Sequence, residues 1–121
     1  TTARGCLTRY AELGRELAER ALPIVAVIVS EAANPDVRAL AETIEEQRAT
    51  GTRAVARHVA DRFGLRAGLD IDTAADVLWV LTAPETMIRF IQRRGWTWDA
   101  YEQWLADAMT SSLTAARRNR S

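Results

Sequence analysis

The chain has 121 residues, of which 48% are hydrophobic and 26% are charged, and its formal net charge is zero. This length suits one domain with its own buried core, and the balanced charge argues against general attraction to nucleic acid or anionic lipid. The single cysteine, Cys6, excludes an internal disulfide. The apolar runs are far shorter than the ~20 residues of a membrane span, and the start lacks a signal-peptide layout, so we predict a cytoplasmic protein.

The first predicted helix covers residues 3–22, where Leu7, Tyr10 and Gly14 recur at helical spacing. Pro23 interrupts this pattern. The following segment, "IVAVIVSEA", has the composition of a strand. No second run of this kind offers a partner strand, and an isolated strand leaves its backbone groups unpaired. We therefore predict a helix that starts at Pro23 and is buried on nearly all sides.

The segment "NPDVRAL" carries the signals of another helix start. Asn34 suits the N-cap, Pro35 suits the first helical position, and Gly64 suits the position just past the end. These signals predict a helix that runs to about Phe63.

The apolar stripe of this helix is interrupted between Ile44 and Val55, where Arg48 and Gly51 stand instead. A glycine inside a helix costs ~1 kcal/mol relative to alanine, so either another backbone passes close to Gly51 or a cavity lies there. His58, the only histidine, lies near this gap. It is either a satisfied core residue or a polar group in a ligand pocket.

A third long helix is predicted from a cap at Asp72 to a stop at Gly95, with a bend at Pro84. Its apolar arc is about twice the ~100° that a helix packed on one core requires. Burial from two sides, by the protein's own core and by a second copy, explains that width. A central position in a monomeric bundle is the alternative.

Four aromatic residues fall within "GWTWDAYEQW", residues 95–104. A ligand cage, a membrane belt, a nucleic-acid platform and a helix–helix joint are the possible reasons. Acidic residues, rather than arginines, lie between the rings, which disfavours nucleic-acid stacking. Thr97 suits an N-cap, and Trp96 and Tyr101 then occupy the positions of a hydrophobic staple. We predict a helix–helix joint, with the last helix continuing to residue 116.

Catalytic and metal-binding constellations are missing from the sequence. One histidine and one cysteine cannot build a His/Cys metal site, and no glycine-rich phosphate loop is present. A nucleophile pair would require the chain to bring Cys6 to His58. We predict no cofactor, no metal and no enzymatic activity.

The stretch "DIDTAADVLWVLTAPETMIRFIQRRGWTWDAYEQWLADAM" resembles the C-terminal half of tetracycline-repressor-type (TetR-family) regulators. In that family a "D-x-AAD-x-LW-x-L-[ST]-x-PE" helix is followed by "RGW-[ST]" and "YE-x-WLAD", which correspond here to residues 72–85, 94–97 and 101–107. Trp98 departs from the pattern, since relatives often carry proline there. The family's N-terminal helix-turn-helix domain does not lie within these residues.

The resemblance implies an all-α antiparallel bundle of about five helices that binds a small effector and dimerises through its last two helices. We therefore predict that residues 1–121 form the effector-binding and dimerisation domain of a transcriptional repressor. Effector binding would release DNA held by a helix-turn-helix domain outside this chain, so these residues alone should not bind DNA specifically. The alternative is a helical adaptor that dimerises without a small-molecule ligand.

Two sets of site residues follow from the helical spacing and the resemblance. The predicted pocket takes a hydrophobic or aromatic effector and is lined by Tyr10, Val55, His58, Val59, Trp79, Ala83 and Phe90. The predicted homodimer interface consists of Leu81, Pro84, Ile88, Ile91, Trp104, Leu105, Ala108 and Ser112.

Overall fold

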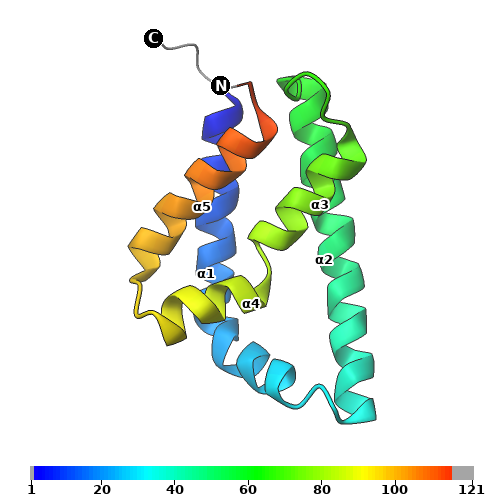
Figure 1. Cartoon of the computed structure of the whole chain (residues 1–121), viewed down its shortest axis with the longest axis vertical. Helices are drawn as coiled ribbons and strands as arrows, with labels where there is room; N and C mark the ends of the chain where they lie inside the picture. The colour runs from blue at the N-terminus through cyan, green and yellow to red at the C-terminus, as the bar shows by residue number, and fades with distance from the viewer. Residues whose placement is uncertain (1, 116–121) are drawn as a thin grey trace.

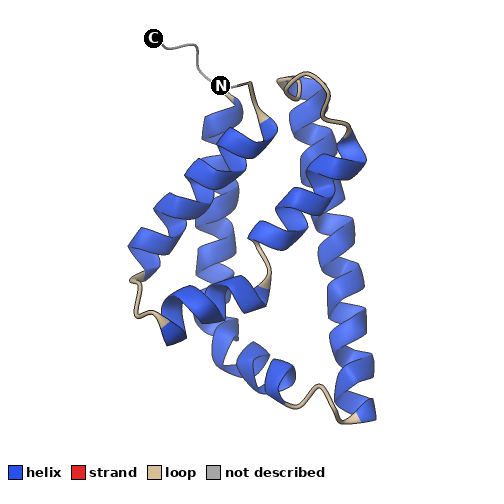
Figure 2. Cartoon of the chain, viewed as in Figure 1, coloured by secondary structure: helices blue, strands red, loops and turns tan. Residues whose placement is uncertain are grey.

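The computed structural model describes residues 2–115, and every regular element in this range is helical (Figure 2). The predicted all-α class is therefore confirmed. In chain order the elements are α1 (Ala3–Ser30), α2 (Pro35–Arg62), α3 (Ile71–Leu81), α4 (Pro84–Met87), the π-helix η1 (Ile88–Arg93) and α5 (Trp98–Leu113).

The helices pack mainly as two pairs, α1 with α5 and α2 with α3, and α3 also contacts α5 (Figure 1). The short α4 contacts α1. Where the pairs meet, apolar side chains form a single core. Its members are Leu7, Ala11, Ala56, Val59, Ala74, Ala75, Leu78, Tyr101, Leu105, Ala106, Met109 and Leu113.

The prediction of a separate helix beginning at Pro23 is wrong, because α1 continues through that residue to Ser30. Figure 1 shows that α1 bends over its last turns. The bend is expected because Pro23 has no backbone N–H to donate and its ring clashes with the preceding turn of the helix. The predicted burial of this segment is also wrong: Ile24 is 66% exposed and Val27 is 59% exposed. Pro23 is itself exposed, so water can satisfy the carbonyl that lost its hydrogen bond.

Helix α2 matches its predicted limits. The Asn34 side chain accepts a hydrogen bond from the backbone N–H of Asp36 at 2.9 Å, and Pro35 is the first helical residue. Gly64 follows the helix end with φ +83°, a left-handed conformation that glycine adopts without the steric cost of a Cβ.

The single helix predicted over residues 72–94 is divided into α3, α4 and η1, and its N-cap is Asp70 rather than Asp72. The Asp70 carboxylate accepts a hydrogen bond from the backbone N–H of Thr73 at 2.7 Å. Ala83 has an extended backbone, with ψ 143°, as residues before proline prefer. Pro84 therefore begins a new helix instead of bending an existing one.

Helix α5 begins where predicted. The Thr97 hydroxyl accepts a hydrogen bond from the backbone N–H of Ala100 at 3.0 Å. The helix ends at Leu113, short of the predicted residue 116, which lies outside the described residues.

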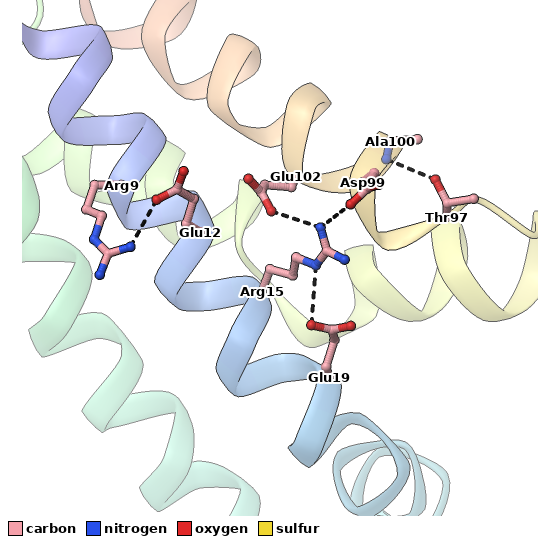
Figure 3. A network of polar contacts seen from close by, with 8 residues as sticks. All are labelled: Arg9, Glu12, Arg15, Glu19, Thr97, Asp99, Ala100 and Glu102. Carbon is pink, nitrogen blue, oxygen red and sulfur yellow. Dashed lines mark hydrogen bonds and ion pairs between the residues drawn. The ribbon is translucent and has the colours of Figure 1, made fainter.

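Arg15 of α1 connects α1 to the first turn of α5 (Figure 3). Its guanidinium donates to Asp99 at 2.5 Å and to Glu102 at 3.0 Å, both on α5, and to Glu19 on its own helix at 3.3 Å. These hydrogen bonds raise the pKa of Arg15, and the bond with Asp99 contributes more than the bond with Glu102. At the other end of the pair, Arg4 binds Asp107 at 2.8 Å. These partly exposed pairs set the register of α1 on α5 more than they add stability.

Candidate ligand cavity

A cavity of about 410 Å³ lies among α1, α2, α5 and the α3–α4 junction. This volume falls within the ~300–1,000 Å³ that small-molecule sites occupy. Most of its lining is apolar, contributed by Leu17, Ala18, Ala21, Leu22, Val25, Ile44, Pro84, Met87 and Leu105. A second depression, at the α2–α3 connection, is an open surface groove that includes the exposed residues Arg53, Asp70 and Asp72.

Two helical glycines on facing helices make room for this cavity. Gly14 of α1 and Gly51 of α2 both line it, and a Cβ added to either would meet no other atom within 4 Å. Of the two explanations offered for Gly51, a closely passing backbone is therefore wrong, and a cavity is what the structure shows.

Arg48 forms much of the polar end of the cavity. Its guanidinium donates to Glu45 at 2.7 Å, to the Trp79 carbonyl at 2.8 Å and to the Thr82 hydroxyl at 3.1 Å, and it lies over the Trp79 ring, 5.6 Å from its centroid. Arg48 thus satisfies a carbonyl at the C-terminal end of α3, where intrahelical donors run out. It connects α2 to the α3–α4 junction.

Two tyrosines, Tyr10 and Tyr101, complete the polar end. Tyr101 is fully buried, and its hydroxyl has no hydrogen-bond partner. Burial raises the pKa of Tyr101, partly offset by the Arg48 charge. Burial also raises the pKa of Tyr10, against the opposing effects of Arg48 and of the nearby Thr82 hydroxyl. Both hydroxyls therefore keep their protons at neutral pH and can donate.

Of the predicted pocket residues, only Tyr10 lines the cavity. Val59 is in the core. His58 is exposed, and its ring meets the edge of Phe63, with the centroids 6.4 Å apart. Trp79 is 37% exposed beside Arg48. The other three predicted residues, Val55, Ala83 and Phe90, are half-buried outside the lining.

The cavity lies on the Ile44 side of Gly51, whereas His58 lies on the other side. Besides the apolar lining, the predicted pocket omitted the four other polar residues of the cavity: Arg48, Thr52, Thr82 and Tyr101. The gap in the apolar stripe of α2 was the available signal for the first two. Ile44, Arg48 and Thr52 recur every fourth residue, so the interruption of the stripe is the polar wall of the cavity.

Phe90 belongs instead to an aromatic cluster between η1 and α5. Its ring centroid lies 4.2 Å from that of Trp96 and 4.7 Å from that of Trp104. The predicted helix–helix joint is confirmed, but the ring partner of Trp96 is Phe90, from the preceding element, rather than Tyr101. The cluster closes the turn between η1 and α5.

The residues predicted for a dimer interface have different environments. Ile88 and Ile91 of η1, and Trp104, Ala108 and Ser112 of α5, are half-buried within one chain, as are Leu81 and Pro84. Leu105 is only 2% exposed and lines the cavity. A second copy could not reach it, so the interface proposed below excludes Leu105.

Within residues 2–115, no group of three or more His, Cys, Asp or Glu side chains is arranged to hold a metal ion. None of the helices described in this range is both long enough and apolar enough to cross a bilayer. Comparison of the chain with protein-family models, curated proteins and solved structures found no match.

Proposed function

We propose that this chain is the effector-binding and dimerisation domain of a TetR-type transcriptional repressor. The observation that carries the proposal is the apolar cavity with a few polar groups gathered at one end, which is the usual composition of a small-molecule site. The sequence resemblance over residues 72–107 supports the TetR assignment and its bundle of about five helices. DNA would be bound only by a helix-turn-helix domain outside these residues.

The cavity suggests how an effector would act. It is bounded by Thr82, Pro84 and Met87, which belong to the α3–α4 junction and to α4. A ligand that favours one position of this junction would shift the population of that state. Because η1 follows α4 directly and contacts α5, the shift would reach the proposed dimer interface. Two DNA-binding heads span half-sites about 34 Å apart, so small movements there would change DNA affinity.

Binding of the neutral fluorophore 1-aminoanthracene tests the effector site. We expect saturable binding to the wild-type chain and its loss in Ala21→Phe, which fills the cavity from α1. The control is Ala39→Phe, on an exposed position of α2 outside the lining, and it should bind as wild type does. Binding that survives Ala21→Phe, or no binding at all, would favour the adaptor function. The exposed side chains of Ile24 and Val27, which a protein partner could cover, are the observation that favours that second function.

Sedimentation tests the proposed homodimer. We expect an interface of at least ~1,200 Å² built from η1 and α5, and a dimer at micromolar concentration. Ala108→Arg should produce monomers, because it forces an unpaired charge into a dry contact. Ser111→Arg adds the same charge at an exposed position of α5 and should leave the dimer intact. A monomeric wild-type chain would contradict this part of the proposal.

A further inference from the structure

The Tyr101 hydroxyl is the one buried side-chain polar atom in residues 2–115 that lacks a hydrogen-bond partner. Tyr101 is 0% exposed and lines the cavity. An unsatisfied buried hydroxyl is costly in a folded protein, so native structures nearly always pair such groups. Because Tyr101 also lines a cavity that opens to solvent beside Leu17, which is 70% exposed, the unpaired hydroxyl points to a partner that enters the cavity.

Three other polar residues of the lining, Arg48, Thr52 and Thr82, already have hydrogen-bond partners. Arg48 binds Glu45, the Trp79 carbonyl and Thr82. The Thr82 hydroxyl donates to the Leu78 carbonyl at 2.7 Å, and the Thr52 hydroxyl donates to the Ala49 carbonyl at 3.1 Å. Tyr10 lies near Thr82 and Arg48 and is only half-buried. The Tyr101 hydroxyl is thus the fully buried donor of the lining that lacks a partner.

Charge decides what kind of acceptor fits this donor. Arg48 is the one charged side chain of the lining, and its guanidinium is paired with the Glu45 carboxylate at 2.7 Å. A ligand carboxylate would therefore lose its hydration without meeting an unpaired cation, which is strongly unfavourable. A neutral oxygen loses less hydration and still gains from the positive field of Arg48, which acts on both tyrosines.

We infer that the ligand of this cavity is a neutral, mainly apolar molecule with a carbonyl-type oxygen that accepts a hydrogen bond from the Tyr101 hydroxyl. This inference rests on the proposed effector site and specifies its chemistry. The apolar body of the ligand lies among Leu17, Leu22, Ile44 and Met87, and its oxygen lies at the end that holds the tyrosines and Arg48.

Three probes with one scaffold test the inference: benzophenone, diphenylmethane and diphenylacetate. Benzophenone differs from diphenylmethane by a carbonyl in place of a methylene group, and diphenylacetate adds a charge. In calorimetric titrations of the whole chain, benzophenone should bind on the order of 5- to 10-fold more tightly than diphenylmethane, as one net hydrogen bond implies. Diphenylacetate should bind most weakly.

The variant Tyr101→Phe removes only the hydroxyl. It should bind benzophenone and diphenylmethane equally, with the diphenylmethane affinity unchanged. Without ligand it should unfold at the same temperature as wild type or higher, because the hydroxyl has no partner to lose. The control is Thr110→Val, which removes a buried hydroxyl of the same helix that does have a partner, the Ala106 carbonyl at 2.7 Å. It should unfold at a lower temperature and keep the benzophenone preference.

The outcomes separate the inference from the function on which it rests. Equal binding of benzophenone and diphenylmethane by wild type, or a preference that survives Tyr101→Phe, overturns the inference but leaves a small-molecule site in place. Tightest binding of diphenylacetate also overturns it, in favour of an anionic ligand. If the wild-type chain binds neither these three probes nor 1-aminoanthracene, both the inference and the proposed function are overturned. A Tyr101→Phe chain that is clearly less stable than wild type shows that the hydroxyl already has a partner.

Discussion

Replacing Gly51 with alanine should stabilise the protein. Gly51 lies inside α2 with an ordinary negative φ, and a Cβ there would meet no other atom within 4 Å. Alanine is favoured over glycine in a helix interior by ~0.8–1.0 kcal/mol, because the unfolded glycine has more conformations to lose. With no clash to set against this, the free energy of unfolding should rise by about 1 kcal/mol.

Thermal unfolding at fixed protein concentration measures this effect. Concentration must be held constant because association would itself raise the unfolding temperature. For a domain of this length, ~1 kcal/mol corresponds to an increase of about 4 °C. The matched control is Gly95→Ala. Gly95 has φ +72°, so alanine there should lower the free energy of unfolding by ~1–2 kcal/mol.

A Gly51→Ala chain that is less stable than wild type would refute the reasoning. It would mean that another backbone approaches Gly51 in solution, from a second copy or from a rearranged α1. Gly14→Ala, on the facing helix with the same empty surroundings, would then show whether the disagreement concerns one residue or the whole cavity.

Two further predictions concern helix caps. Thr97→Ala removes the acceptor for the Ala100 N–H and should lower the free energy of unfolding by ~1 kcal/mol. In a urea titration this appears as a lower midpoint with an unchanged slope. An unchanged midpoint would show that water replaces the cap. The backbone hydrogen bond from Thr73 lowers the pKa of Asp70. The contribution of the Asp70 carboxylate to the free energy of unfolding is therefore present in full above the unfolded pKa of about 3.9. It is lost as pH falls through the lowered folded pKa. Asp70→Asn should keep the cap and lose that part of the pH dependence in acid titrations; an identical acid profile would contradict this.

The helix ends that sequence reasoning predicted correctly are those set by local chemistry. Asn34, Pro35 and Gly64 at α2 and Thr97 at α5 act within one turn of the chain, so the sequence alone is enough to assign them. Asp70, rather than Asp72, is the cap of α3. Both residues are aspartates and both have capping chemistry, so the choice depends on where the preceding connection leaves the backbone.

The two prolines show what local chemistry cannot decide. Pro23 lies inside a helix that continues past it, while Pro84 begins a new one. Solvent around Pro23 can satisfy the lost backbone bond. At Pro84 the chain must turn so that α4 can contact α1. Which outcome occurs depends on tertiary packing rather than on the proline itself.

The candidate site was predicted on α1 and α2, which do line the cavity, but on the other side of Gly51 and without α5. The prediction extended one helical period through residues 72–94, which aligned Trp79 with Phe90. The extended backbone at Ala83 and the wider turns of η1 remove that alignment. Tyr101 of α5 reaches the cavity only because α5 packs along α1, a long-range contact that no periodicity encodes.

The π-helical turns of η1 also determine how well this segment would tolerate the deletion of one residue. In η1 the Arg94 N–H bonds to the Arg89 carbonyl, five residues back, at 3.0 Å, so each turn holds more chain than an α-turn does. Loss of one residue between Ile88 and Arg93 could therefore be absorbed by reversion to α-helical turns, with both ends held by their neighbours. A one-residue deletion in this segment should be better tolerated than one in the middle of α2 or α5, where it would rotate every later side chain by about 100°.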